Sequence, residues 1–219
     1  TPFNLVIAVN PTPVVSNVSQ TICSGNSFNI TPSASIIPVG TTYDWPAPSS
    51  PAALSTLASG TAQNVISGTL TSNANTDQTA IYTVTPTSNL GCMGANFTAT
   101  ITVHPTPVVA DLTAVICSGS TFTVVPNNNP ATNIIPANIQ YTWPTPIGSG
   151  FVGGAAQSNP QINISQTLSN TTVDPVTSTY SVTPSTTFSC PGTPFNVIVT
   201  INPAPTVAFS PAPQTICSG

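Results

Sequence analysis

Apolar residues occupy every second position in residues 97–104, and residues 195–202 and 3–10 have the same arrangement. A period of two over eight residues predicts a half-buried β-strand, because successive side chains on a strand point to opposite faces. No stripe with the 3.6-residue period of a helix is sustained anywhere. These three segments are therefore expected to be equivalent strands.

Shorter strands are expected at regular intervals between the long ones. The 25 prolines and many β-branched residues oppose helices, and short strands bounded by turn residues are typical of a sandwich. We predict an all-β protein made of tandem immunoglobulin-like β-sandwich domains. The further strands lie at 27–32, 43–46, 66–70 and 82–86 in one part of the chain, and at 121–126, 141–144, 164–168 and 180–184 in the other.

The tetrapeptide Ile-Cys-Ser-Gly occurs at residues 22–25, 116–119 and 216–219. A period near 95 residues matches one small β-sandwich domain of about 100 residues, so each copy marks a new domain. We predict two complete repeats, 14–107 and 108–205. Residues 1–13 are expected to be the last strand of a preceding repeat, and 206–219 the first strand of a following one. Length differences place loops at 127–140 and between Trp143 and Leu168.

Charged side chains are almost missing. Soluble domains contain about 25% charged residues, whereas this chain has four Asp, no Glu, no Lys and no Arg. Its 39% hydrophobic content is too high for a disordered chain, and no apolar run approaches the length of about 20 residues that spans a membrane. The polar part of the surface must therefore consist of uncharged Ser, Thr, Asn and Gln side chains that hydrogen-bond to water. The low net charge favours association, including lateral self-association.

This composition excludes several classes of function. Without Lys or Arg, neither nucleic acid nor an anionic membrane surface has cations to bind. The four carboxylates do not recur at equivalent positions, and His104 is the only histidine. We therefore expect no catalytic residues, no metal site, no cofactor and no enzymatic activity. His104, whose counterparts are Asn202 and Asn10, is expected to be a solvated side chain.

Two cysteines belong to each repeat. Cys23 and Cys92 lie in the first and Cys117 and Cys190 in the second, while Cys217 begins a third whose partner lies outside this sequence. We predict the disulfides Cys23–Cys92 and Cys117–Cys190, which imply an oxidising, extracellular environment. Buried free thiols are the alternative. A zinc site lacks the usual CxxC or HxxxH spacing.

Aromatic residues recur with the repeat. Trp45 and Trp143 are expected to pack in the core near the disulfide, although an exposed tryptophan could instead stack on a ligand. Tyr82 and Tyr180 are expected to be core residues with hydroxyls directed at the backbone. Pro-x-Pro triplets at 11–13, 105–107 and 203–205 lie between repeats and predict semi-rigid linkers.

The ordered motifs resemble a known family. Ile-Cys-Ser-Gly, Tyr-x-Trp, a leucine followed by Thr or Ser and then Asn (Leu-Thr-Ser-Asn at 70–73, Leu-Ser-Asn at 168–170), Tyr-x-Val-Thr-Pro, Cys-x-Gly-x-x-Phe and Pro-x-Pro follow one another twice over residues 14–205. This order resembles the PKD-like repeats of giant Bacteroidota surface adhesins of the SprB gliding-filament type. The resemblance implies an immunoglobulin-like sandwich, secretion by the type IX system, and a cell-surface protein that serves in attachment or gliding motility.

Two functions are compatible with these features. The first is a structural role, in which neighbouring repeats form the stalk of an extracellular filament or adhesin. The second is a binding module whose polar loops contact a polysaccharide or another surface. We expect one continuous chain of repeats, and strands exchanged between separate subunits are the alternative.

Overall fold

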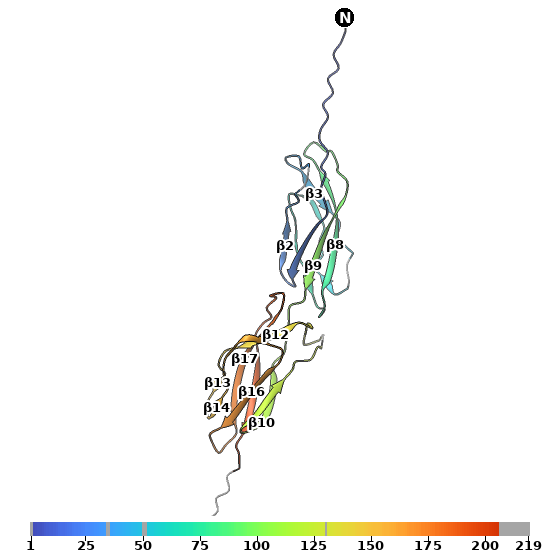
Figure 1. The fold of residues 1–219 in the computed structure, drawn as a ribbon. Helices are drawn as coiled ribbons and strands as arrows, with labels where there is room; N and C mark the ends of the chain where they lie inside the picture. The colour runs from blue at the N-terminus through green and yellow to red at the C-terminus, as the bar shows by residue number, and fades with distance from the viewer. Residues whose placement is uncertain (1, 34–35, 50–51, 130, 206–219) are drawn as a thin grey trace, which may run out of the picture. The chain divides into compact units, whose positions relative to one another are not determined.

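The structure is a computed structural model that describes residues 2–33, 36–49, 52–129 and 131–205. Its chain forms two compact units (Figure 1). The first unit comprises the residues up to Ala110 together with Pro126–Tyr141 and Thr183–Pro194. The second comprises Asp111–Val125, Thr142–Val182 and the segment that begins at Phe195. Two segments of the second sequence repeat thus belong to the first compact unit.

The described residues form β-strands and no helices, which confirms the all-β prediction. The strands of the first repeat are β1 Val18–Cys23, β2 Ser27–Ile30, β3 Thr42–Trp45, β4 Leu54–Ser55, β5 Gly60–Gln63, β6 Ile66–Thr69, β7 Thr71–Ser72, β8 Gln78–Thr87 and β9 Phe97–His104. Those of the second are β10 Leu112–Cys117, β11 Ser120–Val124, β12 Ile139–Trp143, β13 Ile147–Gly148, β14 Phe151–Gly153, β15 Gln157–Gln161, β16 Ile164–Asn170, β17 Val176–Thr186 and β18 Phe195–Asn202.

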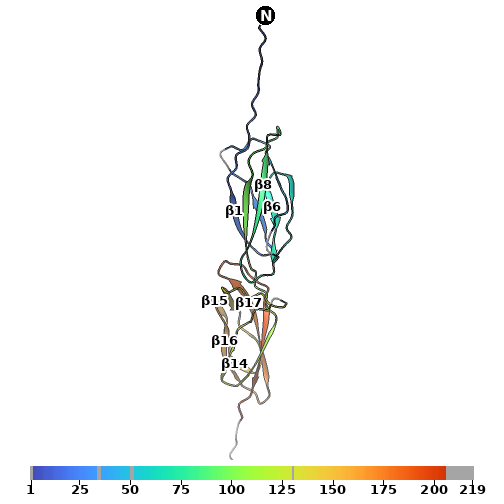
Figure 2. The same ribbon diagram turned by 90° about the vertical axis from the view of Figure 1, so that its right-hand side faces the viewer.

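Each repeat pairs its strands in a main sheet and smaller ones (Figure 2). In the first repeat the main sheet has the order β1-β9-β8-β3-β5, and β2-β6 and β4-β7 form separate pairs. In the second repeat the main order is β10-β18-β17-β12-β15, with β13 on β17, and a second sheet has the order β11-β16-β14. The segment between Trp143 and Leu168, expected to be a loop, thus contains short strands of its own. The equivalent segment between Trp45 and Ile66 contains the short strands β4 and β5.

The first strand of each repeat pairs with the last strand in parallel. Along β1 and β9 the register runs from Val18 opposite Ala99 to Cys23 opposite His104. The same pairing joins β10 to β18 and ends with Cys117 opposite Asn202. The cysteine of each Ile-Cys-Ser-Gly motif is therefore fixed beside the carboxyl end of the long alternating strand.

Alternation along the strands produces the core. In β9 the residues at alternate positions are buried, from Phe97 to Val103, as the sequence pattern requires. Rings from facing sheets meet there, since Phe28 of β2 lies 5.6 Å from Tyr82 of β8, centroid to centroid. In the second repeat Phe122 of β11 lies 5.2 Å from Tyr180 of β17. Two sheets thus pack face to face in each repeat, as a β-sandwich requires.

Hydroxyl pairs take the cross-strand positions that ion pairs often occupy. Thr121 Oγ1 lies 2.6 Å from Thr167 Oγ1, and Thr123 Oγ1 lies 2.9 Å from Ser165 Oγ, both between β11 and β16. Ser27 and Thr69 make the corresponding 2.8 Å contact between β2 and β6. Such pairs stabilise a sheet by a few tenths of a kcal/mol up to about 1 kcal/mol each. They are neutral, so added salt does not screen them.

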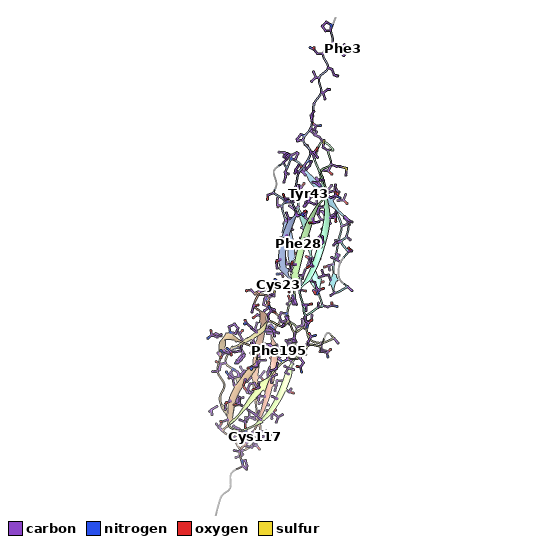
Figure 3. All side chains as sticks on the ribbon, turned by 45° about the vertical axis from the view of Figure 1, so that its right-hand side comes forward. Phe3, Cys23, Phe28, Tyr43, Cys117 and Phe195 are labelled. Atoms are coloured by element: carbon purple, nitrogen blue, oxygen red, sulfur yellow. A yellow bond between two sulfur atoms is a disulfide. The ribbon has the colours of Figure 1, made fainter. Side chains whose placement is uncertain are left out.

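The N-terminal segment has the sequence pattern of β9 but is not a strand here. Phe3 and Val9 are 89% and 88% exposed, and no strand partner is assigned to residues 2–10. In Figure 3 Phe3 lies on this segment, whereas Phe28 and Tyr43 lie among the strands of the first repeat. The apolar side chains remain exposed because the segment lacks the neighbouring strands that flank β9. Residues 206–219, the other expected partial repeat, lie outside the described part of the chain.

All four tyrosines are buried, which predicts a loss of stability in alkali. Burial raises the pKa of Tyr141 and of Tyr180 to about 12, and raises that of Tyr43 and Tyr82 as well. In the unfolded chain a tyrosine ionises near pH 10. The stabilisation is therefore complete below about pH 10 and is lost as pH rises toward 12. Absorbance of tyrosinate and circular dichroism, followed together, should show ionisation coupled to unfolding.

Tyr180→Phe supplies the control, because it removes one ionising group and keeps the ring. It should weaken the alkaline pH dependence of the unfolding free energy. Four tyrosines that ionise near pH 10 in a chain that stays folded would contradict the prediction.

Candidate functional site

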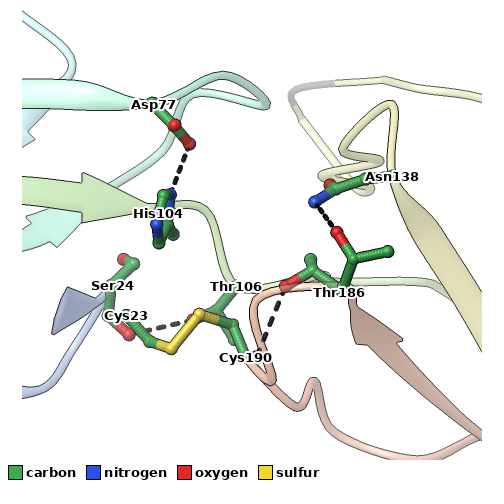
Figure 4. Close-up of a disulfide and its surroundings, with 9 residues drawn as sticks. Cys23, Ser24, Asp77, His104, Thr106, Asn138, Thr186 and Cys190 are labelled. Atoms are coloured by element: carbon green, nitrogen blue, oxygen red, sulfur yellow. Dashed lines mark hydrogen bonds and ion pairs between the residues drawn. A yellow bond between two sulfur atoms is a disulfide. The ribbon is translucent and has the colours of Figure 1, made fainter. Parts of the chain in front are cut away.

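A disulfide joins the two repeats' motifs within the first compact unit. It connects Cys23, at the end of β1, to Cys190, in the loop between β17 and β18, with a Cα–Cα distance of 5.6 Å (Figure 4). The two cysteines are 167 residues apart in sequence. We call the residues around this bond the cystine cluster: Cys23, Ser24, Asp77, His104, Thr106, Thr186, Phe188 and Cys190.

This bond corrects the pairing expected from the sequence. Cys23 and Cys92 do not pair, nor do Cys117 and Cys190; Cys92 and Cys117 are free thiols in this structure. The parallel register places Cys23 beside His104, whereas Cys92 precedes Phe97 at the opposite end of β9. The seven residue steps from Phe97 to His104 span more than about 20 Å, and Cys92 lies before Phe97, in the loop with Ser88, so the length of β9 separates it from Cys23. A disulfide needs Cα atoms within about 7 Å, so a bond inside one repeat is geometrically impossible.

Each residue of the Ile-Cys-Ser-Gly motif has a separate structural role. Ile22 is buried in the core, and Asn26 N donates to Cys23 O at 3.0 Å across a β-turn. Gly25 has a φ of +88°, which the third position of a type II turn requires and which glycine adopts without strain. Ser24 Oγ donates to Ser72 O at 3.2 Å and accepts from Ser72 N at 2.8 Å. The motif thus turns the chain and ties β1 to the strand β7.

The loop around Cys190 is held by its own hydrogen bonds. Thr186 N donates to Cys190 O at 3.2 Å, and Cys190 N donates to Thr186 Oγ1 at 3.3 Å. Gly192 N donates to Pro184 O at 2.8 Å, which closes the loop. Cys190 itself is fully buried. The sulfur is therefore presented from a fixed backbone rather than from a flexible loop.

Glycine at position 192 lets the linker between the repeats pass against this loop. A Cβ atom at Gly192 would lie 2.2 Å from Pro107 O, closer than any real contact. The first repeat has the same arrangement, since a Cβ at Gly94 would lie 2.2 Å from Pro13 O. The repeated Cys-x-Gly spacing was the sequence signal for this contact, although its role could not be derived from the sequence alone.

His104 is engaged rather than solvated, which corrects the expectation for this residue. Its Nδ1 atom lies 2.8 Å from Asp77 Oδ1, and its side chain is only 13% exposed. The imidazole stacks on the ring of Phe188, with centroids 3.8 Å apart and planes 1° from parallel. Thr106 Oγ1 donates to Ser24 O at 3.0 Å beside them (Figure 4). The residues of this stack are far apart along the chain, and the one sequence signal is that His104 and Phe188 both depart from the repeat pattern, with Asn202 and Leu90 as their counterparts.

The other residues singled out in the sequence occupy structural positions. Trp45, Trp143, Tyr82 and Tyr180 are all buried, between 0% and 5% exposed. The indole N–H groups donate to backbone oxygens, Trp45 to Ala58 at 3.2 Å and Trp143 to Ala155 at 3.1 Å. Tyr180 OH donates to the Gln166 side chain at 3.3 Å instead of to the backbone. Cys217 lies outside the described residues.

Carboxylates are used locally, one at a time. Asp111 Oδ1 accepts from Asn196 N at 2.7 Å, and its counterpart Asn17 accepts from Thr98 N at 2.8 Å. Asp44 Oδ1 accepts from Ala62 N at 2.9 Å. Within the described part of the chain, no three potential metal ligands gather in one place.

Substituting Gly192 should disturb the cystine cluster through the backbone. In Gly192→Ala the new methyl group meets Pro107 O, so the loop or the linker must move, at a cost of about 2 kcal/mol of unfolding free energy. The neighbouring exposed substitution Thr193→Ala is the control and should change stability by less than about 0.5 kcal/mol. Denaturant unfolding compares the two, and equal stability would show that the contact is not tight.

The stack of His104 on Phe188 should protect the disulfide from reduction. His104→Asn and Phe188→Leu install the residues found at the equivalent positions Asn202 and Leu90, and a double-mutant cycle should give a coupling of about 1 kcal/mol. Because reduction of a buried sulfur requires local opening, each variant should be reduced about fivefold faster. Asp77→Asn, which removes a half-exposed partner, should have a smaller effect. Additive effects, or unchanged reduction rates, would contradict the coupling.

The described residues contain no helix of the length and apolar character needed to cross a membrane.

Among solved structures, the chain is similar to the D00-D0 domain of intimin, with 17% identity, a TM-score of 0.33, and 84% of this chain and 95% of that chain covered. It is also similar to CfaE, the adhesive subunit of CFA/I fimbria of enterotoxigenic Escherichia coli, with 9% identity, a TM-score of 0.32, and 87% and 99% coverage.

A third similar structure is BT4661, a SusE-like surface-located polysaccharide-binding protein of Bacteroides thetaiotaomicron. It has 11% identity and a TM-score of 0.31, and the match covers 86% of this chain and 33% of that one. No curated protein sequence matches the chain. The family model of the PKD-like domain matches residues 20–107 and again residues 114–205, so the chain belongs to the PKD-like domain family.

Proposed function

We propose that the chain is a structural segment of a long extracellular filament or adhesin stalk, in which PKD-like repeats follow one another and hold an attachment site away from the cell. The role assigned to the repeats is mechanical and not catalytic. The observation that carries the proposal is the disulfide between Cys23 and Cys190, since it links motifs of successive repeats independently of the peptide linker.

The linker itself is fixed by hydrogen bonds within the first compact unit. Val108 N donates to Ile134 O at 3.0 Å, and Ile134 N donates to Val108 O at 2.8 Å. Ala110 N donates to Asn133 Oδ1 at 2.8 Å. With Pro107 against Gly192, these bonds leave the residues after the Pro-x-Pro triplet little freedom to rotate. A segment that must transmit force benefits from a linker of this kind.

Chemistry of the chain supports an extracellular location. Disulfides persist in oxidising compartments and are rare in the cytosol. Reduction of Cys23–Cys190 would release a loop of 167 residues, which the chain-entropy model values at about 5 kcal/mol. The absence of Lys and Arg leaves no site for trypsin-like proteases. Both properties suit a protein exposed outside the cell.

The resemblance of the ordered motifs to Bacteroidota surface adhesins extends the proposal to secretion by the type IX system and to gliding motility. Deleting the complete gene in its host and scoring cell spreading and surface attachment tests this extension. Cells that glide and attach normally would restrict the proposal to a surface filament without a role in motility.

Polysaccharide binding is the second candidate function, and the burial of the tryptophans and tyrosines argues against it. Sugar rings commonly stack on exposed Trp or Tyr, yet both tryptophans and all four tyrosines are buried. A hollow of about 340 Å³ is lined by Thr172, Val173 and Pro203–Pro205, without a charged or aromatic group. A glycan array probed with the chain tests this role directly, and strong binding to one glycan class would favour it.

Electron microscopy of the native protein, in buffer with and without a reductant, tests the structural role. We expect a regular fibre or beaded rod under oxidising conditions, and a more bent particle after reduction because the bond across the linker is lost. Compact globular particles under oxidising conditions would contradict the proposal. Alkylating the reduced sample keeps the disulfide from re-forming and serves as the control for the bent form.

A further inference from the structure

We propose that the bond between Cys23 and Cys190 is one rung of a continuous disulfide ladder, in which the Ile-Cys-Ser-Gly cysteine of every repeat is joined to the Cys-x-Gly cysteine of the next repeat. Cys117 then pairs with the second cysteine of the following repeat, and Cys92 pairs with the first cysteine of the preceding one. The ladder rests on the proposed long chain of repeats, and it assigns a partner to Cys92 and Cys117, the free thiols among the described residues.

The backbone that presents Cys117 matches the backbone that presents Cys23. Ser118 N donates to Asn202 O at 2.8 Å, as Ser24 N donates to His104 O at 2.8 Å. Ser118 Oγ also donates to Asn170 O at 3.3 Å and accepts from Asn170 N at 2.9 Å, as Ser24 does with Ser72. Figure 3 shows Cys117 at the end of its strand. Cys117 is therefore presented by the same backbone turn that presents Cys23 in the observed disulfide.

The loop that presents Cys92 matches the loop that presents Cys190. Ser88 N donates to Cys92 O at 3.0 Å, and Cys92 N donates to Ser88 Oγ at 3.1 Å. Gly94 N donates to Pro86 O at 2.8 Å, the same distance as between Gly192 and Pro184. Pro13 O also lies close against Gly94, in the same way as Pro107 O lies against Gly192. The loop and the linker that hold Cys190 in the observed disulfide therefore have the same arrangement around Cys92.

The free cysteines and their neighbours are less covered than the bonded ones. Cys190 is fully buried, whereas Cys92 is only half-buried. Cys23 is half-buried, whereas Cys117 is exposed. Ile22 and Val109 are 8% and 7% exposed, whereas their counterparts Ile116 and Val15 are only half-buried. These differences mark the surface that a neighbouring repeat would cover.

Each rung forms by thiol–disulfide exchange in the oxidising compartment. The thiolate of Cys117 attacks a donor disulfide, of a protein or a small thiol, which forms a mixed disulfide and releases one donor thiol. The cysteine of the next repeat then attacks the Cys117 sulfur, which forms the rung and releases the second donor thiol. Two thiols are oxidised by two electrons, and the donor disulfide is reduced to two thiols.

The ladder limits how far the chain can be stretched. From Cys190 only 27 residues lead to Cys217, where the next rung begins, so the shortest covalent path uses 27 residues for every two repeats. At about 3.4 Å per residue this path is about 100 Å long, or about 50 Å per repeat. Bonds inside each repeat would allow about 90 Å per repeat, and a reduced chain about 330 Å. The pairing pattern is therefore measurable as a length.

Peptide mapping of the native full-length protein, alkylated before digestion and cut with pepsin without reduction, tests the pairing. The flanking sequences distinguish the five cysteines of this segment when the peptides are long enough: Val-Ile precedes Cys117, Ser-Gln-Thr-Ile precedes Cys23, and Pro-Gln-Thr-Ile precedes Cys217. We expect Cys23 linked to Cys190, Cys117 linked to a Cys-x-Gly peptide of a further repeat, and Cys92 linked to an Ile-Cys-Ser-Gly peptide of a further repeat.

The opposing results are equally specific. Alkylated Cys92 and Cys117 beside an intact Cys23–Cys190 bond would overturn the ladder without affecting the proposed stalk. A Cys117–Cys92 link would mean that separate copies are joined end to end, which also overturns a ladder within one chain. Pairing of Cys23 with Cys92 would overturn the rung from which the inference starts.

Single-molecule stretching of the same full-length protein gives an independent measurement. The fully extended length should be about 50 Å per repeat before reduction and about 330 Å per repeat after it. A length of about 90 Å per repeat in the oxidised protein would exclude the ladder. The reduced and alkylated protein is the matched control, because it has the same sequence and no rungs.

Discussion

Parallel register between the first and last strands of each repeat is the constraint on which the rest of the structure depends. Because Cys23 lies beside His104 and Cys92 precedes Phe97, the length of β9 separates the two cysteines of one repeat. No choice of side-chain rotamer can close that distance. The register also brings the Ile-Cys-Ser-Gly turn to the end where the linker leaves β9, and so to the loop that contains Cys190.

A chain with so few charges still builds an ordinary sandwich because neutral hydroxyl and amide groups make the turn and cross-strand contacts that charged side chains often make elsewhere. Ser24, Ser118 and Asn170 satisfy backbone groups at the turns, and Thr and Ser hydroxyls pair across β11 and β16. Each of these contacts contributes little alone, so stability depends on the apolar core and on the cystine. Such a balance makes stability insensitive to salt and sensitive to the redox state.

Most of the fold could be predicted from the sequence because its signals are local. Alternation identified β9 and β18, and the repeated motifs identified β2, β3 and β6 with errors of at most two residues at their ends. The motif at 82–86 identified only the second half of β8, which begins at Gln78. Pairing partners were not predictable, since nothing in β1 distinguishes a parallel partner from an antiparallel one. The expected disulfides failed for that reason: equal cysteine spacing in two repeats suggested a bond within each, although it is equally compatible with bonds between successive repeats.

The candidate site was less predictable than the fold because it is assembled from residues that do not repeat. His104 has Asn at its equivalent positions, and Phe188 has Leu90 as its counterpart. A search for repeated chemistry therefore passes over the stack between them. Its signal lies in the paired departure of both residues from the repeat pattern, which becomes visible only when the register places His104 beside Cys23.

Loop entropy and strand register favour different partners for Cys23, and their magnitudes decide the outcome. In an unfolded chain Cys92, 69 residues away, meets Cys23 more often than Cys190 does at 167 residues, an advantage of about 0.8 kcal/mol. A bond to Cys92 would, however, prevent β9 from pairing with both β1 and β8, which removes the centre of the main sheet and far more than 1 kcal/mol of buried apolar surface. The native bond is thus the stable one, but the competing bond closes faster. Correct pairing therefore requires β9 to fold before the cysteines are oxidised, and an isomerase or slow oxidation would favour that order.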